Sequence, residues 1–312
     1  MTDRPEISII IPSYNVEQYM LACLQSLKNQ TFRDFQCIIV DVSTDGTPRI
    51  IEDFIKTDAR FSVAYGVNKG GPGGARNAGV KMAAGNYVCF VDADDYCHPQ
   101  MLEILYKTAQ GRDIATARII QTKQALGADY AKISGYKTTV FDDPLKTYLL
   151  SHDKIHTAVY SRLYKKSLVE QTPFIEDIMS EDTVFTVVVM DKAKSMAMAD
   201  AGLYYYYKNP ASIMGASFSE HKMHSYLTAI RSVHSYIKDN SPPYLTLAQQ
   251  RVCTPIFMML HNRAVRKNKD ADMAAKLLPE LKQAAKTLHA QGIISYSGIS
   301  LHHKIRLWNI LR

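Results

Sequence analysis

The chain has 312 residues, enough for one large domain or two smaller ones. Hydrophobic residues make up 46% and charged residues 21%, the balance of a globular protein with a buried core. No apolar run reaches the roughly 18 residues that a membrane-spanning helix needs. The net charge of +7 predicts anionic partners, which could be nucleotides, nucleic acid or a membrane surface.

The cysteines and the first residues indicate a cellular compartment. The five cysteines are odd in number and include no Cys-x-x-Cys pair. They fit buried thiols in a reducing compartment better than a disulfide framework or a zinc site. Residues 1–6 lead directly into the first predicted strand without a signal-peptide pattern. We therefore expect a cytoplasmic protein.

Strand-like and helix-like segments alternate through the first hundred residues. Runs of β-branched and aromatic residues predict strands at residues 7–11, 37–40, 61–65 and 87–91. Periodic apolar positions predict helices at residues 16–29, 49–57 and 75–84, and a further helix from Met101. A glycine-rich loop, 68–74, precedes the third of these helices. Crossovers of this length imply an α/β fold with a parallel, doubly wound sheet.

After Tyr106 the alternation becomes irregular, and after about residue 219 it becomes helical. Short strands are predicted at 114–117, 137–141 and 203–207, and helices at 144–150 and from Glu181, whereas 159–168 is ambiguous. Four more helices are predicted at 220–238, 245–267, 272–289 and 301–311. This change of pattern divides the chain into a first domain, 1–215, and a helical C-terminal region, 216–312.

Polar side chains follow three of the predicted strands. Ser13-Tyr14-Asn15 follows the first, Asp41 the second, and Asp92, Asp94 and Asp95 the fourth. Ligands bind at the carboxyl ends of parallel strands. Carboxylates this close together repel unless a divalent cation or several donors hold them. A metal site is one interpretation; an aspartate-rich turn that caps the next helix is the other.

These groups match the needs of a nucleoside diphosphate. An aromatic ring such as Tyr14 can stack on the base, and a carboxylate can accept from a base N–H group. Glycine N–H groups and a helix start can face the diphosphate, with Lys69 and Arg76 as cations. Each feature also has a structural interpretation: Tyr14 as a core-edge residue, Asp45 as a helix cap, and the glycines as a plain loop.

Four motifs occur in a characteristic order and spacing: Ile-Ile-Ile-Pro-Ser-Tyr-Asn (9–15), Val-Asp-Val-Ser-Thr-Asp-Gly (40–46), Gly-Gly-Ala-Arg-Asn-Ala-Gly (73–79) and Phe-Val-Asp-Ala-Asp-Asp (90–95). Together they resemble a family 2 glycosyltransferase of GT-A fold, of the bacterial cell-surface polysaccharide or lipopolysaccharide type. The resemblance spans about residues 7–215 and includes the segments 161–168, 180–182, 205–208 and 212–213. It implies a GT-A doubly wound, mostly parallel sheet with a C-terminal helical region.

The resemblance implies a nucleotide-sugar site with a divalent metal, Mn²⁺ or Mg²⁺. It implies that Asp41 contacts the base, that Asp92 contacts ribose or metal, and that Asp94 is the main metal ligand. Pro12, Tyr14 and Arg76 complete the expected donor site. The family usually has two aspartates and a glycine before Ser-Thr-Asp. Here Asp41-Val42-Ser43 is one residue shorter.

The resemblance also implies an inverting hexosyltransferase that works by single displacement. A sugar would pass from a nucleotide-sugar, by default a UDP-hexose, to a hydroxyl of a glycan or lipid-linked glycan. Because that hydroxyl must lose a proton, a carboxylate base is required. Asp182 is the expected base. Glu181 is a second catalytic candidate, or a residue at the helix start with no chemical role.

Other function classes fit less well. Sugar nucleotidyltransferases resemble a different opening motif, with a glycine-rich loop directly after the first strand. A degenerate sugar-nucleotide binder or scaffold of a polysaccharide assembly complex is the non-enzyme alternative, and the intact Asp92, Asp94 and Asp182 argue against it. No nucleic-acid-binding module is recognised, so a nucleic-acid partner is not expected.

The last predicted helix is amphipathic and basic. Its apolar residues recur at helical spacing: Leu301, Ile305, Trp308 and Leu311. It carries Lys304, Arg306 and Arg312 and no acid, and a further basic cluster lies upstream, at residues 263–269. One interpretation is peripheral association with the anionic inner face of the cell membrane. The other is packing on the helical bundle or on a second subunit of a homodimer.

Overall fold

The computed structural model describes residues 4–67, 70–123, 131–151, 155–208, 218–266, 268, 270–297 and 301–311. Several of the predicted features lie outside these residues: Lys69, the motif residues 212–213, the domain boundary at 215/216, Lys267, Lys269 and Arg312. No helix in the described part combines the length and the apolar character needed to cross a bilayer.

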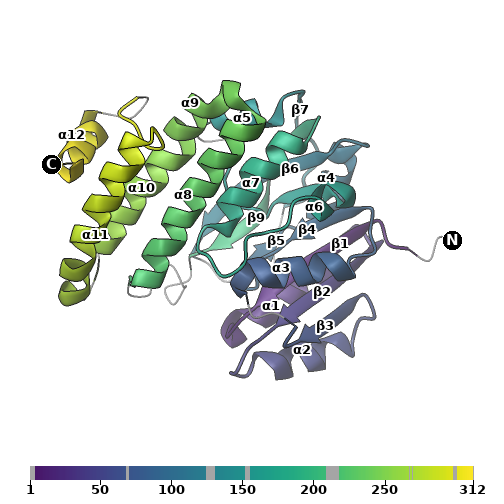
Figure 1. The fold of residues 1–312 in the computed structure, drawn as a ribbon. Coiled ribbons are helices and arrows are strands. Elements are labelled where there is room, and N and C mark those ends of the chain that lie inside the picture. The colour runs from purple at the N-terminus through teal and green to yellow at the C-terminus, as the bar shows by residue number, and fades with distance from the viewer. Residues whose placement is uncertain are drawn as a thin grey trace.

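One mixed sheet forms the centre of the molecule (Figure 1). Its strands, within the described residues, are β1 (Ile7–Ser13), β2 (Phe35–Asp41), β3 (Phe61–Tyr65), β4 (Tyr87–Phe90), β5 (Tyr96–Cys97), β6 (Ile114–Thr122), β7 (Thr138–Phe141), β8 (Arg162–Lys165) and β9 (Met196–Tyr207). The order is β3-β2-β1-β4-β8-β6-β9-β5, and β7 also pairs with β9. The β1–β4 half is parallel, as predicted, whereas β8 is antiparallel to both β4 and β6.

Helices cover both faces of the sheet, which explains why β1, β2 and β4 consist mostly of buried apolar residues. The helices of this half are α1 (Glu17–Lys28), α2 (Thr47–Ile55), α3 (Gly71–Met82), α4 (Met101–Ala109), α5 (Pro144–Leu150), α6 (Lys166–Glu170) and α7 (Glu181–Lys192). Alternate residues of β1 belong to different cores. Ile9 packs with α1, α2 and α4, and Ile10 packs with α3 and α7.

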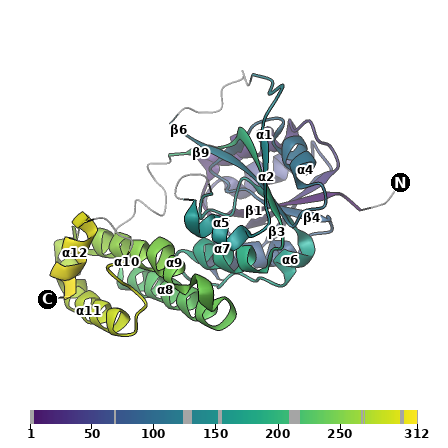
Figure 2. The same ribbon diagram turned by 90° about the horizontal axis from the view of Figure 1, so that it is seen from above.

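The C-terminal helices extend the core that contains Ile10, α3 and α7. They are α8 (Glu220–Asn240), α9 (Leu245–Ala248), α10 (Thr254–His261), α11 (Ala271–Ala290) and α12 (Leu301–Leu311). The stretch 245–266 is helical throughout, with π-helical turns at 249–253 and 262–266. α8 packs on α7 and α9 on α5, whereas α11 and α12 lie farthest from the sheet (Figure 2). The helical region and the sheet therefore share a continuous core.

Two local features differ from the sequence-based expectations. Residues 71–74 of the glycine-rich stretch are helical, because α3 begins at Gly71 rather than at Ala75. Close packing accounts for the glycine at position 73, because a Cβ there would lie 2.6 Å from the carbonyl oxygen of Ile175. The ambiguous stretch 159–168 contains β8 and the start of α6.

Candidate active site

The ends of β1 and β2 are joined by hydrogen bonds between their loops. Val42 N–H donates to the Ser13 carbonyl oxygen at 3.1 Å, and Asn15 N–H donates to Ser43 Oγ at 2.8 Å. The Asn15 side-chain oxygen accepts from Thr44 N–H at 2.8 Å, and Asn15 has a positive φ of 52°. These contacts hold both loops in one conformation at the carboxyl edge of the sheet.

Asp41 lies at this edge and is only 1% exposed. Its carboxylate accepts from Ser43 Oγ at 2.6 Å and from Ser43 N–H at 3.3 Å. The shortened motif thus folds Ser43 back onto the aspartate, a role that the sequence analysis missed. Pro12 is partly buried in β1, whereas the Tyr14 side chain is 57% exposed beside this edge.

The turn after β4 separates three aspartates into two groups. Asp95 is 2% exposed, and it accepts from Tyr204 Oη at 2.7 Å and from Tyr207 N–H at 2.8 Å. The Tyr204 hydroxyl in turn accepts from Asp92 N–H at 3.0 Å. Desolvation, followed by the charges of Asp92 and Asp94, raises the pKa of Asp95 to about 9. Asp95 therefore anchors the turn to β9, and Asp92 and Asp94 remain partly exposed.

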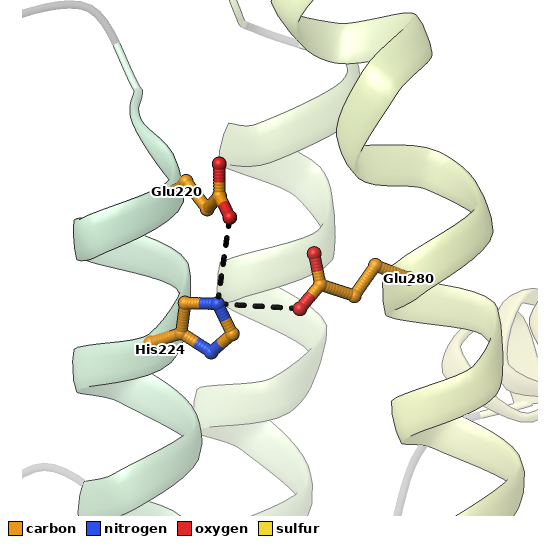
Figure 3. Close-up of side chains that lie close together, drawn as sticks. All are labelled: Glu220, His224 and Glu280. Carbon is orange, nitrogen blue, oxygen red and sulfur yellow. Dashed lines mark ion pairs between the residues drawn. The ribbon is translucent and has the colours of Figure 1, made fainter.

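Asp92 and Asp94 suit a hard divalent cation, because Mn²⁺ and Mg²⁺ prefer carboxylate oxygens and keep positions for water or phosphate. A different cluster lies on the outer surface, where Glu220 and His224 of α8 face Glu280 of α11 (Figure 3). His224 Nε2 is 3.2 Å from Glu280 Oε1, and Lys276 Nζ is 3.0 Å from Glu220 Oε2. This exposed cluster is an ion-pair network between α8 and α11, because Lys276 already supplies a positive charge beside the glutamates.

Arg76 is buried between two carboxylates from different parts of the chain. Its Nη2 lies 2.9 Å from Asp92 Oδ1, and its Nη1 lies 2.6 Å from Glu181 Oε1. The Phe174 ring lies against the guanidinium, 5.5 Å from centroid to Cζ. Burial opposes the charged form of Arg76, yet the charges of Asp92 and Glu181 raise its pKa overall. Arg76 thus joins the turn after β4 to the first turn of α7.

The loop before α7 is held against α3. Asn77 Nδ2 donates to the Phe174 carbonyl oxygen at 3.0 Å, and Phe174 N–H donates to Asn77 Oδ1 at 2.8 Å. Asp177 N–H donates to the Gly70 carbonyl oxygen at 2.8 Å. Ser180, directly before the helix, has a positive φ of 65°. The Arg-Asn pair of the 73–79 motif therefore positions the residues that start α7.

Asp182 is the second residue of α7 and is partly exposed. Its Oδ1 accepts from Thr183 N–H at 2.7 Å. Desolvation and the neighbouring charge of Glu181 raise the pKa of Asp182 to about 7, although Arg76 acts in the opposite direction. A carboxyl group with a pKa near neutrality can accept a proton at physiological pH.

Stacked tyrosines lie close to these carboxylates. The Tyr160 ring stacks on Tyr204, with centroids 4.3 Å apart, and is nearly parallel to Tyr206 at 6.2 Å. Burial raises the pKa of Tyr160, and the charges of Asp92, Asp95 and Asp182 raise it further. Tyr160 was not singled out from the sequence, because its contacts are made with a strand more than forty residues later in the chain.

Comparisons with known proteins agree with this geometry. The family model described as "Glycosyl transferase family 2" matches residues 8–172. The uncharacterized glycosyltransferase EpsJ of Bacillus subtilis is 33% identical over 256 residues, which cover 74% of this chain and 71% of EpsJ. The poly(ribitol-phosphate) β-N-acetylglucosaminyltransferase TarS of Staphylococcus aureus is 32% identical over 210 residues, 64% of this chain and 35% of TarS.

Two solved structures share the fold. The crystal structure of S. aureus TarS 1–349 in complex with UDP-GlcNAc has a TM-score of 0.66 at 20% identity, covering 93% of this chain and 84% of that one. The mannosyltransferase PcManGT of Pyrobaculum calidifontis, in complex with GDP-Man and Mn²⁺, has a TM-score of 0.54 at 15% identity, covering 99% and 80%. The chain belongs to glycosyl transferase family 2 and has the GT-A fold.

Proposed function

We propose that this site transfers a hexose from a UDP-sugar to a hydroxyl of a glycan or lipid-linked glycan, with inversion at the anomeric carbon. The Arg76 bridge is the observation that carries the proposal. It joins Asp92, on the side of the donor, to Glu181, which precedes the proposed base Asp182. This bridge supports a single site in which the proposed donor-binding and proton-accepting groups lie together.

In the proposed reaction, Asp182 accepts the proton of the acceptor hydroxyl as its oxygen attacks the anomeric carbon. The new carbon–oxygen bond forms while the bond to the diphosphate oxygen breaks, and the leaving diphosphate takes the electron pair. The pKa of about 7 makes Asp182 a stronger base than an ordinary aspartate. Glu181 positions Arg76 and keeps the pKa of its neighbour raised.

The donor would lie along the carboxyl edge of β1, β2 and β4. In this arrangement Asp41 and Tyr14, with Pro12, would contact the base, and Asp92 and Asp94 would hold Mn²⁺ or Mg²⁺. When bound, the metal supplies positive charge that stabilises the diphosphate. The UDP-GlcNAc complex of TarS and the Mn²⁺ complex of PcManGT support this choice of donor and metal.

Tyr160 and Tyr206 are suited to the acceptor side. Both rings are partly exposed next to the carboxylates, and a flat aromatic face packs well against the C–H face of a sugar. TarS acts on poly(ribitol-phosphate), as its name states, which supports a cell-surface polymer or its lipid-linked precursor as acceptor. Such an acceptor would be met by a cytoplasmic enzyme at the inner face of the cell membrane.

A thermal-shift screen of nucleotide-sugars with Mn²⁺ tests the proposal. A ligand at 100 times its Kd adds about 2.7 kcal/mol to the free energy of unfolding. We expect UDP-hexoses to raise the melting temperature in Mn²⁺ more than in EDTA, and UDP release to follow when the acceptor is present. Equal shifts with all nucleotides, or none with any UDP-sugar, would contradict a UDP-hexose donor.

A further inference from the structure

The C-terminal helix α12 has apolar residues on two opposite faces. Leu307 and Ile310 are buried in the core shared with α11. Ile305 and Trp308 point the other way and are 53% and 48% exposed. The stripe predicted from the sequence (Leu301, Ile305, Trp308 and Leu311) is therefore not the packing face of this helix. Ile305 and Trp308 face outward, and among the stripe residues whose side chains are described only Leu311 contacts the core.

The surroundings of this outer face are basic. No aspartate or glutamate follows Glu280 in the sequence, whereas the same stretch contains Lys282, Lys286, Lys304, Arg306 and Arg312. Lys286 and Lys304 are exposed. Lys282 and Arg306 line one pocket between α10, α11 and α12, and neither forms an ion pair within the described part of the chain. The end of the bundle thus carries positive charge without acidic neighbours in sequence.

α12 also occupies an accessible position. In both ribbon views it lies at the end of the helical region farthest from the sheet (Figures 1 and 2). A flat surface could therefore approach α12 without meeting the β1–β4 half of the molecule. Exposed tryptophan and isoleucine beside lysine and arginine are the composition of a helix that lies in a membrane interface.

We propose that the outer face of α12 (Lys304, Ile305 and Trp308) docks on an anionic lipid bilayer. The apolar pair would enter the interface and Lys304 would meet lipid phosphates, while Lys282 and Arg306, in the pocket on the packing side of α12, add to the positive charge at this end of the bundle. A symmetric dimer through this face would place Lys304 near its own copy, and two exposed apolar side chains fall far short of the roughly 800 Å² per partner typical of a stable interface. The proposal goes beyond the transfer reaction, because docking uses none of the catalytic carboxylates.

Trp308 is the only tryptophan in the chain, so its fluorescence reports directly on this face. The full-length protein is mixed at low salt with vesicles of phosphatidylglycerol and phosphatidylcholine (1:3), or of phosphatidylcholine alone. We expect a blue shift of the emission and cosedimentation with the anionic vesicles only, both weakened in 0.5 M NaCl.

The variant K304E/I305S keeps the reporter and should bind the anionic vesicles at least tenfold more weakly, since each cation near such a surface is worth about fivefold. Its melting temperature should not change, because both side chains are exposed. The matched control K81E/M82S alters an exposed lysine and a 45% exposed methionine at the end of α3, and should bind like the parent.

Three outcomes would overturn the proposal. They are no blue shift with anionic vesicles at low salt, equal weakening by the control, and a concentration-dependent blue shift without lipid. The last, accompanied by a dimer in light scattering, would assign the face to a second copy of the chain.

Discussion

Arg76 Nη1 lies 2.6 Å from Glu181 Oε1, and this contact distinguishes two adjacent carboxylates. Glu181 is buried and shares the guanidinium with Asp92. Asp182 is partly exposed, and no ion pair to it is found among the described residues. The geometry therefore favours Asp182 as the group that meets the acceptor and Glu181 as the group that holds Arg76.

The first prediction follows from this division of roles. Asp182→Asn should lower kcat by at least a factor of about 100, because the base is lost, while the apparent affinity for the donor stays within about twofold. The measurements are initial rates of UDP release with acceptor and donor binding by calorimetry. Glu181→Gln is the matched comparison and should retain more activity. If Glu181→Gln lost turnover and Asp182→Asn kept it, the two roles would have to be exchanged.

A second prediction concerns Arg76 itself. Arg76→Met should lower the free energy of unfolding by about 3–5 kcal/mol, because Asp92 and Glu181 would be left without their buried cation. The stability of Arg76→Lys should lie between that of the parent and that of Arg76→Met, since an ammonium group cannot present the fork that reaches both carboxylates. Urea denaturation measures the loss. A stability of Arg76→Met equal to that of the parent would show that the bridge contributes nothing to the fold.

A third prediction separates the aspartates of the β4 turn. Asp94→Asn should abolish the difference between Mn²⁺ and EDTA in thermal shifts with UDP, with little change in the melting temperature of the free protein. Asp95→Asn should instead lower that melting temperature, because Asp95 holds Tyr204 and the backbone of Tyr207. Removing the surface cluster with His224→Ala serves as the control and should leave metal dependence unchanged. Full turnover of the parent in EDTA would refute the metal assignment.

The raised pKa of Asp182 predicts a pH dependence. Because the base must be deprotonated, kcat should rise with pH through about 7 and then level off. In Glu181→Gln the midpoint should move to lower pH, since the neighbouring negative charge is lost. Stability should change with pH in the direction opposite to kcat. Because the pKa of Asp182 in the folded protein exceeds its unfolded value near 4, the contribution of Asp182 to the free energy of unfolding is lost as pH rises from about 4 to about 7. A flat rate profile between pH 5 and 9 would contradict the assignment.

The packing of α3 against the loop before α7 can also be tested. Gly73→Ala would place a methyl group 2.6 Å from the Ile175 carbonyl oxygen and should cost about 1–3 kcal/mol of stability. It should also lower activity, because the loop leads into Asp182. Gly135→Ala is the control, since a Cβ there meets nothing within 4 Å and the expected change is near zero. Equal stabilities of the two variants would contradict this packing.

Much of the proposed donor side was predictable from sequence. Apolar runs ending in polar residues located Asp41, Asp92 and Asp94, because strand ends are local features of the chain. The resemblance already favoured Asp182 over Glu181 as the base, but the ion pair that occupies Glu181 could not be predicted, since its partner Arg76 lies 105 residues earlier. Likewise, Asp95 could not be separated from its neighbours without Tyr204, which is 109 residues away.

The orientation of α12 was similarly beyond the sequence. Helical periodicity shows that Ile305 and Trp308 share a face, but both faces of this helix carry apolar residues. Only the contacts of Leu307 and Ile310 with the rest of the bundle decide which face is covered. The need for glycine at position 73 has the same kind of cause, because it depends on the approach of the Ile175 carbonyl oxygen, about a hundred residues later in the chain.

The stereochemistry of transfer tests the central claim most directly. A UDP-hexose with an α-linked sugar is turned over by the full-length protein with Mn²⁺, and the first product is followed by proton NMR of its anomeric signal. Direct displacement assisted by Asp182 predicts a β-linked product, and the same signal should be absent with Asp182→Asn. An α-linked product would contradict single displacement and the role of Asp182 as its base.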